Sequence, residues 1–215
     1  DYGPWRFLPK FDASLTAAYF DQDGRYAYGR QPEAAMWALC RLADCFVKLV
    51  PKNILEETLH GFYGQLDIAI ATALQWRLGI VFSDKDRKRD ALLAYHFFTA
   101  AKASGYGFDQ IFHDLYGGVA RVGGYEGGLW SPLLELMSDA RLQRPGALQH
   151  QHFKRKSAVS LKIDEVESLW APIMAGDNWT PLAEKISTIR AMRSALSGEP
   201  TSTIPKIVGV APTKF

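Results

Sequence analysis

The sequence has few cysteines, and their spacing does not favour a disulfide. Cys40 and Cys45 are the only two among 215 residues. If both lie on one helix, five positions separate them by about 140° around its axis, so they face different ways. Unpaired thiols are typical of a reducing compartment. We therefore expect a cytoplasmic protein in which both cysteines are small core residues.

Excess charge and long apolar runs are also absent. The formal net charge is +2, with 22% charged residues, which provides no overall basic field for nucleic acid or an anionic membrane. The basic run at 154–156 is only three residues long. The longest nearly uncharged stretch, 66–76, is too short to span a bilayer. We expect neither a nucleic-acid partner nor a membrane partner.

What the chain does have is apolar residues at three- and four-residue intervals, which predict a mainly α fold with few or no strands. Residues 1–31 lack this periodicity. An irregular segment of this length is typical of a functional region. The expected organisation is an irregular region (1–31), a helical core (32–143), a linker (144–162), a helical pair (163–197) and a tail (198–215). The expected helices are 32–50, 53–79, one from Ser83 or Asp84 to 103, 108–116, 131–143, one from Asp164, and 180–196.

Local signals indicate where some of these helices begin. Ser131-Pro132 is typical of an N-cap followed by the first helical residue. Asp164 and Glu167 have the spacing of a capping box. Gly61 and Gly64 weaken the first third of the helix at 53–79. A short strand is expected at the end of the linker.

Several short motifs near the start of the chain point to one family. They are Asp1-Tyr2-Gly3-Pro4, Phe7-Leu8, Asp23-Gly24-Arg25-Tyr26, Gln31-Pro32, Trp37, Leu39 and Arg41-Leu42-Ala43. Together they resemble one stretch of the selenoprotein O family of kinase-like proteins. The resemblance is specific to about residue 46 and looser through 116, and 163–195 is similar to one bacterial branch. It implies the helical C-terminal lobe of a protein-kinase-like fold, which begins with the activation segment.

The resemblance also implies a reaction. Members of the family transfer the AMP part of ATP, rather than its γ-phosphate, to hydroxyl side chains of proteins. Asp1-Tyr2-Gly3 resembles the Asp-Phe-Gly element of kinases, in which the Asp holds a divalent metal and the Gly allows a sharp turn. Asp1 is therefore implied as a ligand for Mg²⁺ or Mn²⁺ and, through the metal, for ATP. Protein substrates are the implied partners.

Other parts of the family's catalytic machinery are expected ahead of Asp1. They include the glycine-rich nucleotide loop, the strand lysine and the general base, in an N-terminal kinase-like lobe that would be a partner of this chain. No catalytic base is expected within the chain. Trp5 stands where some members have a redox-active cysteine, so a redox switch is not expected.

Three functional hypotheses follow from this resemblance. The first is the C-terminal portion of a protein adenylyltransferase, which we expect to be inactive as an isolated polypeptide. If the polypeptide began at Asp1, an α-amino group with a pKa of about 7.7–8.0 would lie beside the carboxylate and oppose a cation. The alternative is a non-catalytic helical interaction module derived from this fold. The third hypothesis is ordinary kinase activity.

Two glycine-containing patterns predict backbone turns rather than ligand sites. In Asp21-x-Asp23-Gly24 the glycine comes too early for a calcium loop, so a turn is expected. The segment from Gly117 to Gly124 lacks the Lys-Ser/Thr of a P-loop. It predicts a flexible connection between helices, in which Arg121 is solvated.

Histidines provide weaker candidates for a metal site. His150 and His152 would lie on one side of an extended segment, but no third ligand is near them in sequence. His96 and His113 are expected to be hydrogen-bonded structural residues.

The aromatic residues and arginines of 11–30 have two interpretations. They form a face that receives a protein substrate, or they pack the irregular segment onto the first helix, which is favoured because buried aromatics are usually core residues. The set is Phe11, Tyr19, Phe20, Arg25, Tyr26, Tyr28 and Arg30.

Overall fold

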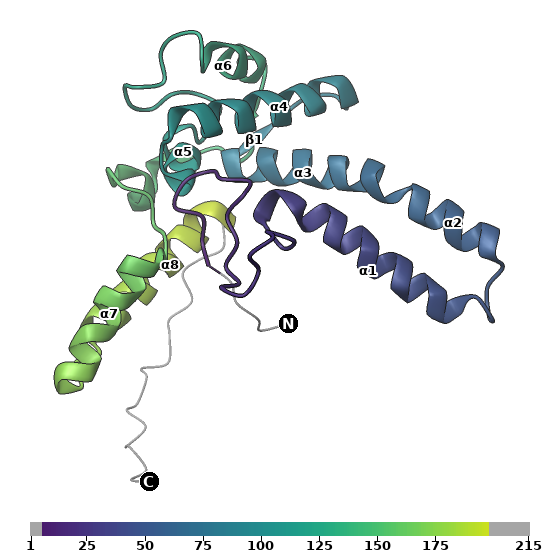
Figure 1. Cartoon of the computed structure of the whole chain (residues 1–215). Helices are drawn as coiled ribbons and strands as arrows, with labels where there is room; N and C mark the ends of the chain where they lie inside the picture. Colours follow the sequence, from purple (N-terminus) through teal and green to yellow (C-terminus); the bar gives the residue numbers. More distant parts are fainter. Residues whose placement is uncertain (1–5, 198–215) are drawn as a thin grey trace.

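The computed structural model of the chain describes residues 6–197, and these are mainly helical, as predicted (Figure 1). Two strands of two residues each form the only sheet in that range. The elements are α1 (Gln31–Phe46), α2 (Lys52–His60), α3 (Phe62–Leu78), β1 (Ile80–Val81), α4 (Arg87–Ser104), α5 (Phe108–Asp114), α6 (Ser131–Met137), β2 (Arg141–Leu142), α7 (Ile163–Gly176) and α8 (Thr180–Ser197). Short 3-10 turns lie at Tyr28–Arg30, Ala147–Gln149 and Gln151–Lys154.

The hydrophobic core lies where the end of α3 meets α4, α5 and α6. In α4, Leu93, Phe97 and Ala101 recur at intervals of four and are all buried, as their periodicity predicts. Leu78 at the end of α3 and Leu133 in α6 are fully buried in the same cluster. This core fixes the position of α5, which forms one wall of the cavity described below.

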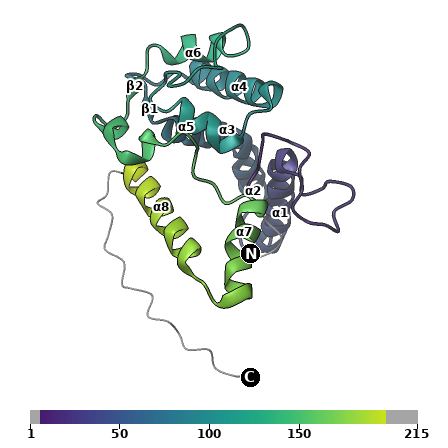
Figure 2. The same cartoon turned by 90° about the vertical axis from the view of Figure 1, so that its left-hand side faces the viewer.

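Two helical hairpins extend from the core in different directions (Figures 1 and 2). One consists of α1 and α2, with α2 running on into α3; the other consists of α7 and α8. No residue of α1 or α2 is buried. We call residues 31–60 the arm. Cys40 is half-buried there and Cys45 is exposed, so the prediction that both are core residues is wrong, because the arm contributes nothing to the core.

Several predicted helix boundaries require correction. The helix expected at 53–79 is two helices, separated at Gly61. The helix expected at 131–143 ends at Met137, because Arg141–Leu142 pairs antiparallel with Ile80–Val81. The expected strand at the end of the linker is absent: 144–162 contain two 3-10 turns and no strand.

The predicted caps also differ from those observed. Asp86, rather than Ser83 or Asp84, caps α4 by accepting from the backbone N–H groups of Lys88 (2.8 Å) and Arg89 (3.2 Å). Ser131 is the first residue of α6, and its hydroxyl donates to the Gly127 carbonyl oxygen (2.8 Å).

The predicted capping box is wrong as well. The helix α7 begins one residue before Asp164, with Lys162 at its N-cap and no side-chain cap. Glu165 in its first turn instead pairs with Lys185 of α8, and so joins the two helices of the hairpin.

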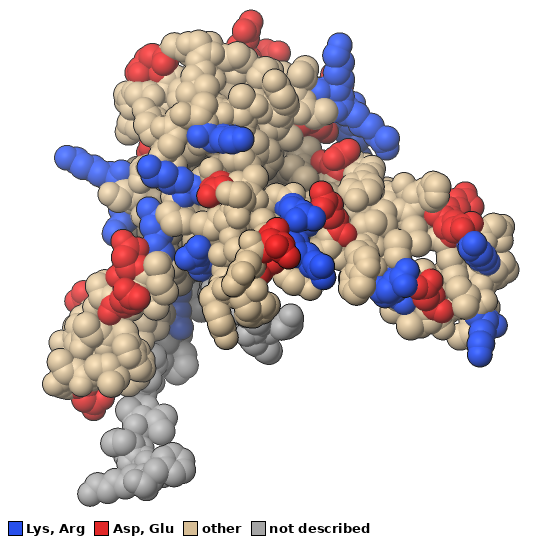
Figure 3. Space-filling model, in the orientation of Figure 1, with Lys and Arg blue, Asp and Glu red and all other residues tan. Residues whose placement is uncertain are grey.

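Charges of both signs are interspersed over the face shown in Figure 3, with no extended basic region on it. No helix within residues 6–197 is long and apolar enough to cross a membrane.

Candidate functional site

Asp1, the predicted metal ligand, lies outside the described residues. Its position relative to the rest of the chain therefore stays a prediction. What the structure places is the segment that follows it, beginning at Arg6.

Residues 7–11 are anchored on the start of α5. Leu8 is buried in the core, and the Phe108 N–H donates to the Pro9 carbonyl oxygen (3.0 Å). The Phe11 ring lies 5.0 Å from that of Phe98 and 5.7 Å from that of Phe108. The first described residues are thus held by both α4 and α5.

The turn predicted at Asp23-Gly24 is confirmed. Gly24 adopts a φ of 62°, in the left-handed region that glycine favours. The carboxylate of Asp21 accepts from the backbone N–H groups of Arg25 and Tyr26, both at 2.8 Å. These bonds, first of all the one from Tyr26, hold the pKa of Asp21 below its usual value. Asp21 is therefore a structural residue that closes this loop.

The aromatic residues of 11–28 divide between the two interpretations. Phe11 and Tyr28 pack against the core, with ring centroids 6.0 Å apart. Packing is thus confirmed for them, but the predicted partner is wrong: Phe11 lies against Phe98 of α4 and Phe108 of α5, not against the first helix. Tyr19, Phe20 and Tyr26 are exposed, Tyr19 by 91%. The packing interpretation is wrong for these three, because none of them is enclosed by the core.

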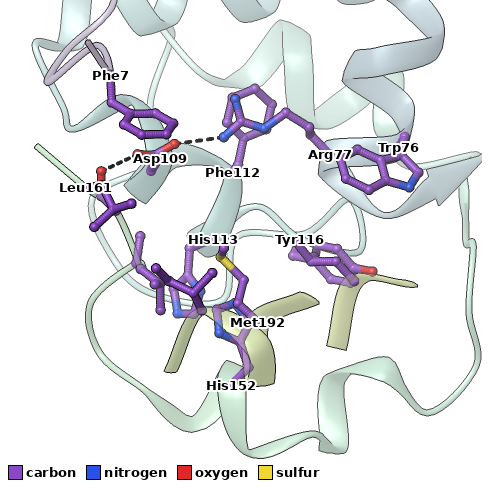
Figure 4. Close-up of a pocket in the computed structure, with 15 residues that line it drawn as sticks. Phe7, Trp76, Arg77, Asp109, Phe112, His113, Tyr116, His152, Leu161 and Met192 are labelled. Atoms are coloured by element: carbon purple, nitrogen blue, oxygen red, sulfur yellow. Dashed lines mark hydrogen bonds and ion pairs between the residues drawn. The ribbon is translucent and has the colours of Figure 1, made fainter. Parts of the chain in front are cut away.

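A cavity of about 290 Å³ lies between α5 and the end of α3 on one side and α8 with the segment before α7 on the other (Figure 4). Its walls come from Phe7, the end of α3, α5, the segment 158–161 and α8. The lining is mainly apolar. The residues labelled in Figure 4 are Phe7, Trp76, Arg77, Asp109, Phe112, His113, Tyr116, His152, Leu161 and Met192.

One wall of the cavity contains an ion pair between Arg77 and Asp109, and each of the two residues has a further contact. Arg77 donates to Asp109 Oδ1 at 2.9 Å, and its guanidinium lies 3.7 Å from the centre of the Phe112 ring. The other carboxylate oxygen of Asp109 accepts from the Ser160 hydroxyl at 2.6 Å. These polar groups satisfy one another and link α3, α5 and the segment leading to α7.

A buried pair of histidines lies on the same cavity, next to Met192 in Figure 4. The rings of His113 and His152 are 5.2 Å apart. His113 Nε2 lies 3.0 Å from the Arg155 carbonyl oxygen, and because a carbonyl can only accept, this nitrogen carries the proton. The Nδ1 atoms of both rings are buried without a hydrogen-bond partner.

Burial keeps both imidazoles uncharged at neutral pH. It is the main cause that lowers the pKa of His113, and it lowers the pKa of His152 to about 4, with His113 and His150 adding to the effect. The prediction that His113 is a hydrogen-bonded structural residue is confirmed. His150 Nδ1 accepts from the His152 N–H at 3.1 Å. No three histidine, cysteine or acidic side chains within residues 6–197 are grouped to hold a metal.

Arg121 is not solvated, contrary to prediction. Its guanidinium donates to the His113 carbonyl oxygen at 2.7 and 3.2 Å, and to the Phe153 carbonyl oxygen at 3.0 Å. Arg121 therefore links the end of α5 to the segment that carries His152. These bonds hold the glycine-rich connection, 117–124, against both.

We expect the free energy of unfolding to fall by about 3 kcal/mol as the pH is lowered from 6.5 to 4 because of His152. The unfolded chain binds a proton at its usual pKa of 6.5, whereas the folded chain resists protonation until about pH 4. The contribution of uncharged His152 to the free energy of unfolding is thus fully present above pH 6.5 and is lost as the pH falls from 6.5 to about 4. Urea unfolding at pH 7, 5.5 and 4.5 measures it.

The matched comparison is His152→Asn against His60→Asn, since His60 is exposed at the end of α2. Relative to the native chain, the His152 variant should show a flatter pH dependence, and the His60 variant an unchanged one. Equal slopes for all three would show that His152 is not the group that titrates.

Comparison with known proteins now identifies the family. A model of the family described as protein adenylyltransferase SelO matches residues 1–121. The chain belongs to the SelO family. The matched part contains α1 to α5, the wall of the cavity formed by α3 and α5, and Asp1 itself. The family predicted from the opening motifs is confirmed.

Relatives in the SelO family are longer than this chain. A protein nucleotidyltransferase YdiU from Rhodopseudomonas palustris (strain CGA009) is 37% identical over 121 residues, covering 54% of this chain and 24% of the relative. One from Jannaschia sp. is 34% identical over 122 residues, covering 54% and 25%. One from Gloeobacter violaceus is 31% identical over 209 residues, covering 88% and 42%. The chain spans between a quarter and about two-fifths of these relatives.

Sequence reasoning missed the cavity and its two polar clusters. Arg77 and Asp109 are 32 positions apart, and Asp109 and Ser160 are 51 apart. Helical periodicity carries no information about which side chains meet over such separations. The signal that the sequence did contain is a charged residue among apolar neighbours: Arg77 near the end of α3 and Asp109 at the start of α5.

Proposed function

We propose that this chain forms the C-terminal part of a protein adenylyltransferase, which transfers AMP from ATP to Ser, Thr or Tyr hydroxyls of other proteins. The observation that carries the proposal is the SelO match over residues 1–121, which begins at Asp1-Tyr2-Gly3. The names of the three relatives, all protein nucleotidyltransferases, support it.

Asp1 would hold Mg²⁺ or Mn²⁺ and, through the metal, the phosphates of ATP. A carboxylate oxygen is the donor that such hard cations take, so the chemistry of this residue fits the role. The metal supplies neutralisation of the phosphate charge. One carboxylate does not complete a coordination shell, and the remaining ligands would come from ATP and from the part of the SelO polypeptide that this chain does not cover.

In the transfer, a hydroxyl oxygen of the protein substrate bonds to the α-phosphorus of ATP. The bond between that phosphorus and the oxygen bridging it to the β-phosphate breaks, and pyrophosphate leaves. The hydroxyl proton goes to a general base, which we place outside this chain. We therefore propose that the chain is inactive by itself. Since both thiols are free, we place the protein in the cytoplasm.

ATP labelled on either the α- or the γ-phosphate tests the proposed reaction. The protein used joins this chain behind the remaining part of the Rhodopseudomonas relative. We expect protein-bound label from α-labelled ATP only, because AMP transfer releases the γ-phosphate with pyrophosphate. Label from γ-labelled ATP would indicate a kinase, and absence of both would favour the non-catalytic module.

A further inference from the structure

The helix α1 is apolar over most of its circumference. Four of its half-buried apolar residues, Met36, Leu39, Cys40 and Ala43, fall within one sector of the helix. A second apolar set is exposed: Ala35, Ala38, Leu42, Cys45 and Phe46. At 100° per residue, the two sets occupy different sectors of the helix. A helix of this kind is normally enclosed on both sides.

The charges of α1 leave the exposed apolar set free. Glu33, Arg41 and Asp44 fall within about a quarter turn of one another. They are engaged along the helix itself, Arg30 with Glu33 at 3.2 Å and Arg41 with Asp44 at 3.1 Å. In Figure 3 the charges of the arm form small groups of opposite sign, separated by uncharged surface. The exposed apolar sector therefore has no charge of its own to keep it in water.

The rest of the arm shows the same imbalance. Leu49, in the connection to α2, is 78% exposed. Trp37, on the charged side of α1, is 65% exposed. Ile54 on α2 is also exposed, and so are Tyr63 and Ile68 on α3, just beyond the arm. Large exposed apolar residues concentrated in one region of the molecule indicate a contact with another polypeptide rather than with water.

We propose that the exposed sector of α1 binds an amphipathic helix from the part of the SelO polypeptide that this chain does not cover. The inference rests on the proposed function. Residues 31–60 lie wholly within the family match at 1–121, so the arm belongs to what the relatives share. Those relatives contain much additional polypeptide, since the chain covers 24–42% of them.

The surface has the shape that helix packing requires. The exposed residues Ala38, Leu42 and Phe46 form a row at intervals of four along α1, with the half-buried Ala34 one turn ahead of them. Such a row is the ridge used when two helices interdigitate. The small residues at the beginning of the row allow a close approach, and the larger ones at its end provide apolar area. The bound helix would carry its apolar residues at intervals of three and four, with polar residues on its outer side.

Co-expression of the whole chain with the remaining part of the Rhodopseudomonas relative, carrying an affinity tag, tests this. We expect the two polypeptides to co-purify with the mass of a 1:1 complex. The double change Ala38→Glu and Leu42→Glu should weaken the complex about 100-fold, because it buries charge at the contact. Lys48→Glu, just beyond the end of α1, should not weaken it.

The variants must first show the same circular dichroism and melting temperature as the native chain, which exposed positions allow. Failure of the native pair to form a complex, or equal binding by the double variant, would overturn the proposal. If this chain alone forms a dimer, and the double change dissociates that dimer, the surface binds a second copy of the chain instead. Binding is measured without nucleotide, so a complex that forms but transfers no AMP would count against the proposed function only.

Discussion

Asp1→Asn is expected to lower AMP transfer about 1,000-fold in the protein that joins this chain behind the remaining part of the Rhodopseudomonas relative. Asparagine keeps the size of the side chain and removes its negative charge, which is what a divalent cation requires of its ligand. A metal ion contributes several kcal/mol to such a transfer, and each 1.36 kcal/mol is a factor of ten in rate. The rate of incorporation of α-labelled ATP is the measurement.

Asp23→Asn is the control for this change. Asp23 belongs to the same irregular segment and is exposed in the turn at Gly24, so its variant should keep the native rate. Equal melting temperatures for the three proteins would show that the fold is unchanged. A native rate in the Asp1 variant would remove the residue from the metal site and favour the non-catalytic alternative.

Gly79→Ala is expected to lower the free energy of unfolding by about 3–5 kcal/mol. Gly79 ends α3 with a φ of 65°, a conformation that costs other residues about 1 kcal/mol or more. An added Cβ would lie 2.3 Å from Cζ of Tyr116. That ring is buried and lies 4.3 Å from the ring of Phe153, so moving it would disturb this contact and the wall of the cavity that it lines.

Gly64→Ala provides a matched control within the same helix. An added Cβ there has no atom within 4 Å. The change should raise the free energy of unfolding by about 0.5–1 kcal/mol, because alanine loses less conformational freedom than glycine. Urea unfolding measures both. If Gly79→Ala were as stable as the native chain, the close approach to Tyr116 would not be rigid; combining it with Tyr116→Ala should recover part of the loss.

The helices that could be predicted are those whose ends are set locally. The helix α8 was expected at 180–196 and lies at Thr180–Ser197, since Thr180-Pro181 determines its start without help from elsewhere. The helix α6 was expected to reach 143 and ends at Met137. Its length is decided by the pairing of Arg141 with Val81, a contact over sixty positions that no local pattern contains.

The predicted site divides in the same way. The family could be predicted from the opening motifs because they are short local patterns that lie close together in the sequence. The histidine pair could not, because the partners of His113 come from another part of the chain and the burial that lowers its pKa exists only in the folded structure. Arg121 was misassigned for the same reason: the two carbonyl oxygens it binds are 8 and 32 positions away.

The absence of buried residues in the arm has a consequence for how the chain opens. The free energy required to open a segment locally follows the apolar surface that the segment buries. The free energy of local opening should be far lower for α1 and α2 than for α4 and α5. Amide hydrogens of the arm should therefore exchange with solvent while the core stays closed. If a partner binds there, part of the binding free energy is used to order the arm. The arm would then act as a separate cooperative unit that is completed by association.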